Sequence, residues 1–262
     1  MIGTTLIFEA LTQNWEIVLL FFCVAVLYSS VGFGGGSSYL AILSLTTLAF
    51  TQIRATALLC NIMVVTSGTL IYAKNGFYNW KKVLPLVLFS VPMAFIGGYL
   101  KISQVFFFIL LGSTLLIAAF FMWMSKYITQ KSKEKNYQKS IIKDISYGGF
   151  IGFISGMVGI GGGIFLAPLL HLTNWDTPKK IAATASFFIL VNSIAGLIGQ
   201  YQNPDFSIEP NITILLLFTV FIGGQIGSRI STKKISPFIL KRTTAVLIAF
   251  VGFRILVKYL LP

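Results

Sequence analysis

Two glycine triplets interrupt the apolar stretches of this 262-residue chain, at residues 34–36 and 161–163. Each triplet ends a Val-Gly-X-Gly-Gly-Gly motif, the first beginning at Val31 and the second at Val158. Hydrocarbon offers no hydrogen-bond partners to free backbone, so a helix broken inside a bilayer must face protein or a water-filled cavity. Paired interruptions at matching places in two halves of a chain therefore indicate a central binding site.

The composition places the chain in a membrane. Hydrophobic residues make up 56% of it, charged residues only 10%, and the mean hydropathy is +0.85. Soluble domains carry about 25% charged residues. The apolar runs are continuous rather than alternating, which argues against membrane strands and predicts an all-α polytopic membrane protein. Residues 1–16 contain no Lys or Arg, so we expect the first apolar segment to be retained rather than cleaved as a signal peptide.

An internal repeat links the two halves. Beyond the glycine motifs, Ala55-Thr56-Ala57 aligns with Ala183-Thr184-Ala185, and the Phe-Ile-Gly-Gly sequence beginning at Phe95 aligns with the one beginning at Phe221. The offsets stay between 126 and 128 residues and the order is the same. Motifs that recur in the same order at a nearly constant offset argue that the two halves arose by duplication.

Each half contains three segments long enough to span a bilayer, which takes about 20 apolar residues. Repeat 1 covers residues 1–124, with spans expected at 55–73, 83–100 and 104–124; repeat 2 covers residues 145–262, with spans expected at 181–201, 210–228 and 235–257. The segments that flank the glycines are shorter and are typical of re-entrant hairpins, at 17–50 and 147–173. Two tilted crossings, or one broken crossing, are the alternatives for each hairpin.

The distribution of basic residues decides between these topologies. If both hairpins are re-entrant, 16 of the 20 basic residues fall on one face of the membrane, whereas eight simple crossings divide them 11 to 9. Basic loops mark the cytoplasmic side. We therefore predict two inverted repeats joined by a basic cytoplasmic connector at 125–144, with both termini on the outer face of the inner membrane. This reading also explains the net charge of +13 without nucleic acid.

The hairpin tips are the candidate site. A re-entrant hairpin brings the start of its second arm to mid-membrane, where the first N–H groups have no partner in their own helix and carry the positive end of the helix dipole. Such a tip favours an anion. The expected contributors are Gly34, Gly35, Gly36, Ser37, Ser38, Gly161, Gly162 and Gly163. The alternative is that these glycines only allow tight helix packing.

Polar side chains near the tips could complete the site. The candidates are Thr56, Asn61, Thr184, Ser186 and Asn192. For each single amide, bonding between helices is the simpler expectation. Thr56 and Thr184 occupy equivalent places in the repeats, so this pair is favoured as a ligand contact.

Other chemistry finds little support. No acidic residue lies deep in an expected span, and the single histidine, His171, sits near the end of the second hairpin. We expect no catalytic constellation, no metal site and no cofactor, and hence no enzyme. Arg54 and Lys101 lie at expected helix ends, where the simplest role is anchoring by snorkelling; attracting anions is a second role.

The paired glycine motifs, the Ala-Thr-Ala pair and the repeated Ile-Gly-Gly elements resemble the TauE/SafE sulfite exporters, also called toluene sulfonate uptake permeases. The likeness covers residues 15–258. It implies an inner-membrane permease for sulfur-containing anions such as sulfite or sulfonates. The chain departs from the family pattern in one place. Residues 37–41, Ser-Ser-Tyr-Leu-Ala, lack the proline that commonly follows the first triplet, whereas repeat 2 has its counterpart, Pro168.

The leading mechanism from these observations is a carrier. A small oxyanion would sit between the tips, and the inverted halves would rock around it. A hairpin-gated anion channel and a non-transporting membrane scaffold are the alternatives. The anion, its direction, any coupling ion and the oligomeric state are not encoded in these patterns.

Overall fold

The computed structural model describes residues 14–30, 34–131, 141–173, 175–229 and 237–260. For residues 125–131 and parts of the last two helices only the backbone is described. The predicted locations of the two chain ends, and residues 31–33 of the first glycine motif, lie outside these ranges.

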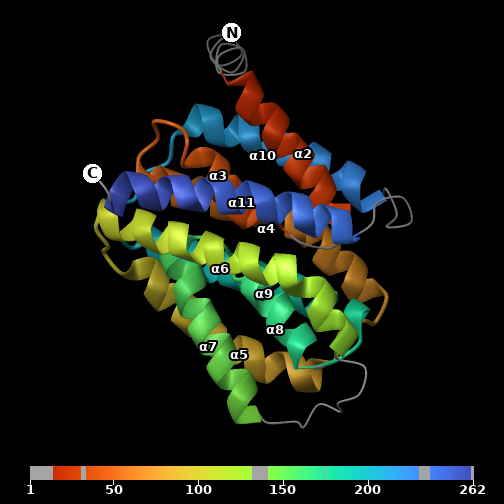
Figure 1. Ribbon diagram of the computed structural model, residues 1–262. Coiled ribbons are helices and arrows are strands. Elements are labelled where there is room, and N and C mark those ends of the chain that lie inside the picture. Colours follow the sequence, from red (N-terminus) through yellow and green to blue (C-terminus); the bar gives the residue numbers. More distant parts are fainter. Residues whose placement is uncertain (1–13, 31–33, 132–140, 174, 230–236, 261–262) are drawn as a thin grey trace.

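The described residues form ten α-helices and no strand (Figure 1). These are α2 (Trp15–Ser30), α3 (Gly36–Leu43), α4 (Phe50–Lys74), α5 (Trp80–Tyr99), α6 (Gln104–Lys131), α7 (Ile141–Val158), α8 (Gly163–Leu172), α9 (Pro178–Tyr201), α10 (Pro210–Arg229) and α11 (Pro237–Leu260). The all-α polytopic fold class is thus confirmed. Six helices among the described residues, α4, α5, α6, α7, α9 and α10, are long and apolar enough to span a bilayer.

Some boundaries differ from the expected ones. The helix α4 begins five residues before the expected span at 55, and so takes in Arg54. The helices α6 and α7 extend into both ends of the expected connector, whose remaining residues, 132–140, are outside the described ranges. Asp144, the last residue of that connector, lies in the first turn of α7 and is buried rather than solvated.

Helices at equivalent places in the two halves pack antiparallel. Arg54, near the start of α4, shares a pocket with Gln200, near the end of α9. Thr69, near the end of α4, bonds to Ser186, near the start of α9, at 3.0 Å. The pair α6 and α11 crosses the front of Figure 1 in the same way, because Phe108 stacks on Tyr259 while Arg242 lies over Trp123. Inverted repeats require this antiparallel relation.

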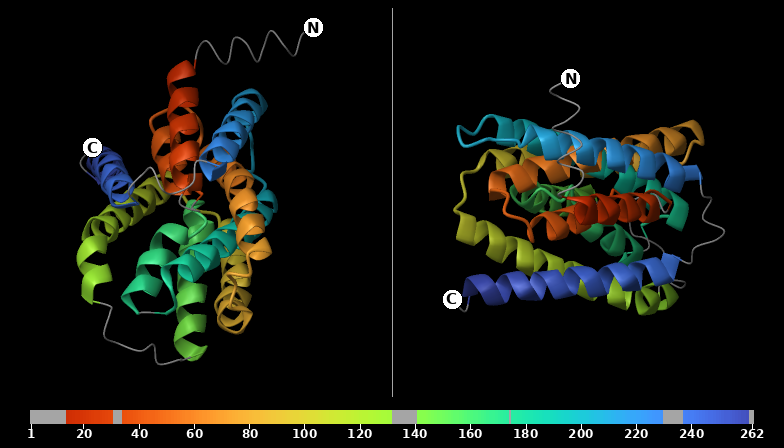
Figure 2. Two further views of the ribbon diagram at one scale, coloured as in Figure 1. Left: turned by 90° about the vertical axis from the view of Figure 1, so that its right-hand side faces the viewer. Right: turned by 90° about the horizontal axis from the view of Figure 1, so that it is seen from above.

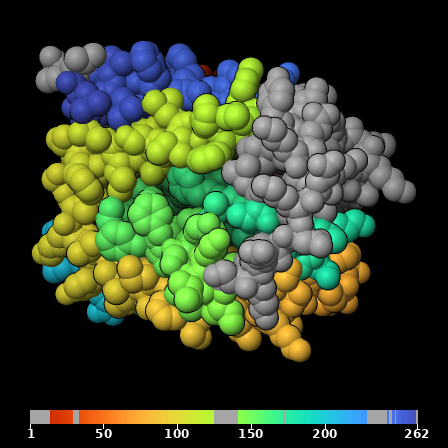
Figure 3. Space-filling view, turned by 60° about the horizontal axis from the view of Figure 1, so that its bottom comes forward, coloured from red at the N-terminus to blue at the C-terminus, as the bar shows by residue number. Residues whose placement is uncertain are grey.

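The other extensive contacts pack a helix of one half against a helix of the other half. The helix α5 runs alongside α7, and α2 runs alongside α10, as two views of the bundle show (Figure 2). Figure 3 shows α5, α6 and α7 on one face of the molecule. Backbones approach closely here: a Cβ on Gly156 of α7 would lie 2.0 Å from the Ala94 carbonyl oxygen of α5. Small residues permit such packing where hydrophobic burial between helices contributes little.

The second hairpin returns to the end of the bundle at which it starts, although its first arm, α7, is itself long and apolar enough to span a bilayer. After α8, Trp175 donates its indole N–H to Asp144 in the first turn of α7, at 3.1 Å. The chain therefore returns to the end of the bundle at which α7 begins. We call this the Lys82 end, defined by Lys82, Asp144, Trp175 and Asp176, and the opposite one the Arg54 end, defined by Thr51, Arg54, Gly98 and Gln200.

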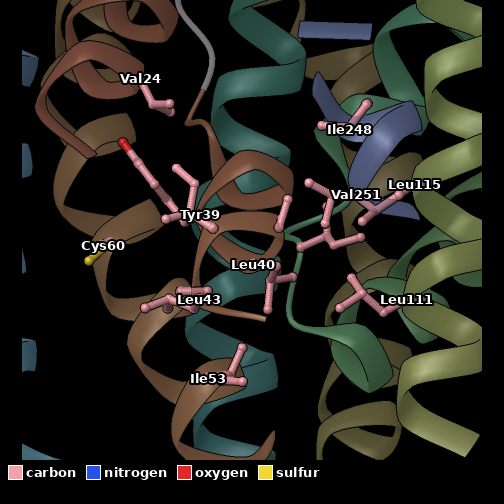
Figure 4. Close-up of a cluster of buried hydrophobic side chains, with 14 of the residues drawn as sticks. Val24, Tyr39, Leu40, Leu43, Ile53, Cys60, Leu111, Leu115, Ile248 and Val251 are labelled. Carbon is pink, nitrogen blue, oxygen red and sulfur yellow. The ribbon is translucent and has the colours of Figure 1, made fainter. Parts of the chain in front are cut away.

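The first hairpin enters from the Arg54 end. The helix α2 runs parallel to α10, which begins there, since Thr213 of α10 bonds to Thr56 of α4 at 2.9 Å. All eight residues of α3 are buried, and Leu40 packs toward Leu111 of α6 and Val251 of α11 (Figure 4). The stacked pair Phe21–Tyr39, with ring centroids 4.6 Å apart, joins the two arms. Such pairs contribute about 1 kcal/mol beyond their buried area.

Candidate functional site

Each hairpin breaks at a glycine that adopts a left-handed backbone. Gly35 has a φ of 87° and Gly162 a φ of 79°, and each is the N-cap residue of the arm that follows. L-residues with side chains rarely adopt these angles. Neither N-cap carries a side-chain hydrogen bond. The first N–H groups of α3 and α8 are therefore not capped by the N-cap side chains, at the positive ends of the two helices.

The two tips lie against each other. A Cβ on Gly36 would fall 2.6 Å from the carbonyl oxygen of Ile160 in the opposite tip. Gly36 begins α3, and Ile160 lies between α7 and α8. The breaks of the two halves thus meet inside the bundle, within backbone contact.

Asn61 of α4 lies between the tips. Its amide Nδ2 donates to the Ile160 carbonyl and to Ser193 Oγ, both at 3.1 Å. A Cβ on Gly34 would lie 1.8 Å from Asn61 Oδ1, and a Cβ on Gly161 would lie 2.4 Å from its Nδ2. Asn61 is the twelfth of the 25 residues of α4, which places it midway along that helix.

Unpaired polar atoms remain at this point. Asn61 is 1% exposed, and its Oδ1 has no hydrogen-bond partner among the described residues. The hydroxyl of Ser155 in α7 is buried and equally unpaired, and its Cβ lies 3.3 Å from where a Cβ on Gly162 would be. Buried polar atoms without partners are uncommon and need a physical explanation.

The sequence reading missed Ser193 and Ser155. Ser193 immediately follows the candidate Asn192, and Ser155 stands seven residues before Gly162. No sequence pattern indicated that either serine lies at the tips. Only the antiparallel packing of α4 on α9, and the fold of α7 back on α8, bring them to the tips.

The first hairpin's serines are buried. Ser37 is 2% exposed and Ser38 is fully buried. Ser38 Oγ lies 3.0 Å from the Tyr28 hydroxyl, so it ties α3 to α2. Gly163, at the start of α8, packs on Ile189 of α9.

The other polar candidates bond within and between helices. Thr56 pairs with Thr213 of α10, and Thr184 donates to the Lys180 carbonyl in its own helix at 2.8 Å. Ser186 pairs with Thr69, and Asn192 donates to Ser90 of α5 at 3.0 Å. Thr56 precedes Asn61 by five residues, or about 7.5 Å along the helix. The structure therefore brings Asn61, rather than the threonine pair, to the tips.

Arg54 is not an anchor at the membrane surface. Arg54 is 3% exposed, and one terminal nitrogen of its guanidinium donates to the Gly156 carbonyl of α7 at 3.3 Å. The guanidinium lies 5.9 Å from the centroid of the Phe107 ring. The snorkelling expectation for Arg54 is therefore wrong, because α4 begins earlier than predicted and carries this residue inside the bundle.

Charged groups gather at the Lys82 end. The Lys82 ammonium donates to the Trp175 carbonyl and to Asp176, which also lies 3.8 Å from Lys180. Burial raises the pKa of Asp176, but the Thr177 N–H and the two lysines outweigh it and hold the pKa below its ordinary value. In the same region burial raises the pKa of Tyr78 to about 12, so its hydroxyl stays a neutral donor to the Thr69 carbonyl.

Across the part of the chain that the structure describes, no three His, Cys, Asp or Glu side chains are grouped so that they could hold a metal ion.

The fold and the buried tips define a multi-pass helical membrane protein with an interior polar site. The chain belongs to the sulfite exporter TauE/SafE family, whose model matches residues 17–255. It is 32% identical to the probable membrane transporter protein y4hK of Sinorhizobium fredii, over 94% of this chain and 99% of that one. It is also 27% identical to the probable membrane transporter protein MJ0441 of Methanocaldococcus jannaschii, over 88% of this chain and 90% of that one.

A third relative is the probable membrane transporter protein YunE of Bacillus subtilis, 26% identical over 78% of this chain and 84% of that one. No solved structure matches the chain. The family and these relatives make the protein a membrane transporter.

Proposed function

We propose that this transporter moves a small sulfur-containing oxyanion, such as sulfite or a sulfonate, bound between the two hairpin tips. The observation that carries the proposal is that the start of α3, at Gly36, lies against Ile160, three residues before α8 begins, and that Asn61 bonds to Ile160. The N-terminal ends of α3 and α8 carry partial positive charge and favour an anion nearby. The Asn61 amide and the Ser193 and Ser155 hydroxyls supply neutral groups that bond oxygen atoms.

We propose that transport proceeds by alternating access, and the antiparallel packing of the two halves supports this. The hairpin α2–α3 enters from the Arg54 end and α7–α8 enters from the Lys82 end, so each half can open the site toward one side. Rocking of one repeat against the other about a fixed site is the usual motion of such folds. With the cell interior negative, an anion leaves the cell electrically downhill, by about 2.3 kcal/mol per charge at 100 mV. Export therefore needs no coupling ion.

We infer that the Lys82 end faces the cytoplasm. Lys74, Lys81, Lys82, Lys143, Lys179 and Lys180 all lie at or near this end, as the helix directions require. Basic residues concentrate on the cytoplasmic side of inner-membrane proteins. A reporter fused after Pro262 should be active only outside the cytoplasm, and cytoplasmic activity would contradict this orientation.

The tip site is tested by adding volume to it. Gly36→Val drives a side chain into the Ile160 carbonyl, and Gly162→Val adds a β-branched residue at a positive φ against Phe188. We expect both variants to lose sulfite flux in proteoliposomes while still inserting into the membrane. Gly224→Ala is the control, because its Cβ would meet α4 at an ordinary 3.8 Å.

Normal flux in both valine variants would rule out the tip site. The substrate class is tested separately by thermal stabilisation of the purified protein with sulfite, sulfate, thiosulfate, sulfonates and small carboxylates. Stabilisation by carboxylates alone would reject a sulfur oxyanion. Counterflow of labelled sulfite distinguishes a carrier from a channel.

A further inference from the structure

A small pocket with polar side chains in its lining lies at the Arg54 end, away from the tips. It is lined by Thr51 and Arg54 of α4, Gly98 of α5, Gln200 of α9, and Asn203 and Phe206 of the following loop. The pocket opens to the exterior of the bundle, and its enclosed part has room for about one water molecule. Nothing in the tip site accounts for it.

Arg54 places a positive charge beside this pocket without a carboxylate partner. The ion pairs between described residues both involve Asp176, at the opposite end. One Arg54 nitrogen bonds to the Gly156 carbonyl near the C-terminus of α7, where a cation is favoured. Among the described residues, its Nε has no hydrogen-bond partner. Burying a charge without an opposite charge is unfavourable, so an anion bound at this position would offset that penalty.

Gln200 adds a second free donor. The residue is 4% exposed, and its Nε2 makes no hydrogen bond within the described structure. Gln200 and Arg54 both line the same pocket, although they come from helices of different halves. A guanidinium and an amide N–H₂ are donors only, and oxyanions provide the matching acceptors.

The pocket is also close to the second tip along the chain. Arg54 precedes Asn61 in α4 by seven residues, about 10 Å along the helix. A Cβ on Gly159 would lie 3.4 Å from the Arg54 Cα, and two residues after Gly159 the chain reaches the second tip. Arg54 therefore contacts the segment that leads directly into the central site.

We propose that this pocket is a second anion site, at the mouth of the transport route, in which Arg54 and Gln200 hold a small oxyanion before or after it occupies the tips. Its role as a station on the route rests on the proposed function, whereas binding at the pocket does not. A sulfite-sized anion exceeds the space of one water molecule, so binding requires the pocket to widen.

The experiment measures sulfite and sulfate binding to the purified full-length protein by calorimetry at constant ionic strength. Gln200→Met keeps the length of the side chain but removes the donor, and it breaks no hydrogen bond of Gln200 Nε2. We expect sulfite affinity to fall by about fivefold or more, since one hydrogen bond to a charged group is lost. The unfolding temperature should stay unchanged or rise.

Two charge variants sharpen the result. Arg54→Gln should weaken binding more than Gln200→Met, whereas Lys101→Gln removes an exposed charge at the same end and should change affinity by less than about twofold, because exposed charges are screened. Unchanged sulfite and sulfate affinity in both Gln200→Met and Arg54→Gln would overturn the proposal. A loss of affinity in Gln200→Met that came with a lower unfolding temperature would also overturn it, because that result indicates a structural role.

The two sites fail separately. If Gly36→Val still transports, the tip site is rejected, while dependence of binding on Gln200 continues to support the pocket. If Gly36→Val stops transport and still binds sulfite in a Gln200-dependent manner, both sites are supported.

Discussion

The two ends of the bundle differ although the two halves of the chain share the same motifs in the same order. At the Lys82 end, Lys82, Asp176 and Lys180 form ion pairs, and Trp175 bonds to Asp144. At the Arg54 end, Arg54 has no carboxylate partner among the described residues, and Gln200 keeps a donor without a partner there, beside a pocket. The charged groups of the Lys82 end are therefore paired within the protein, whereas the Arg54 end retains donors for a ligand.

This difference indicates which end is locked in the structure. In a transporter that opens alternately to each side, the bonds of the Lys82 end must break before that end can open. The Arg54 end has hydrogen bonds between helices, such as Thr56 to Thr213, but no ion pair among the described side chains. Substitutions at the two ends should therefore have different effects. Added volume should block the Arg54 end, whereas removing hydrogen bonds or ion pairs should weaken the Lys82 end.

The largest effect is expected from Gly98→Val at the Arg54 end. A Cβ there would lie 2.2 Å from the Gly196 carbonyl oxygen of α9, and backbone cannot yield as a side chain can. We expect a loss of about 3 kcal/mol in the free energy of unfolding, measured with SDS in mixed micelles. Gly149→Ala is the control, since its Cβ would meet only Met93 at 3.8 Å. Equal stability of the two variants would contradict the packing of α5 on α9.

The second largest effect is expected from Asn61→Leu, because Asn61 lies between the tips of the two hairpins. It leaves the Ile160 carbonyl and the Ser193 hydroxyl without their donor. We expect about 2 kcal/mol of destabilisation and the loss of most sulfite flux. Thr66→Val in the same helix is the control, as its hydroxyl bonds only to the Ile62 carbonyl of its own helix. Flux equal to that of the control would show that Asn61 is not at the site.

A smaller effect is expected at the Lys82 end from Trp175→Phe. The indole N–H is lost from buried Asp144, which should cost about 1 to 2 kcal/mol. Weakening this end should also favour the conformation that is open toward it. Accessibility of a cysteine placed at Ser186 to a thiol reagent added from that side measures the shift. Reduced labelling would contradict the proposed lock.

The smallest effect concerns pH at Asp176. Its pKa is lowered in the folded protein, so its contribution is present above the unfolded value of about 3.9 and is lost as the pH falls through the lower folded value. Partly exposed pairs of this kind contribute under about 1 kcal/mol. The difference in unfolding temperature between the wild type and Asp176→Asn should therefore shrink below pH 4. A constant difference from pH 7 to pH 3 would contradict this.

The glycine breaks could be predicted because their cause is local. Three consecutive glycines in an apolar run interrupt a helix whatever packs around them, and the structure has Gly35 and Gly162 at equivalent positions with positive φ. The expected spans likewise overlap α4, α5, α6, α9, α10 and α11, although α4 begins five residues earlier and α6 ends seven residues later than expected.

The candidate site was predicted less completely. The tip glycines and Asn61 meet, but the Thr56 and Thr184 hydroxyls bond elsewhere, and Ser193 was missed. The expected symmetry of side chains did not hold, because Asn61 aligns with Ile189 and Thr213 has no threonine counterpart at the matching place in α5. Duplicated backbones preserve helix positions, whereas each side chain has diverged with its own neighbours.

The sequence by itself determined the membrane environment, the helical class and the places where the backbone breaks, because apolar length and glycine content act within a single segment. Only the tertiary structure decided that Arg54 is buried beside Gln200, that Asn61 reaches Ser193, and that Asp144 meets Trp175. These contacts join residues 31 to 146 positions apart. Their geometry arises from the crossing of helices, which no local pattern of residues encodes.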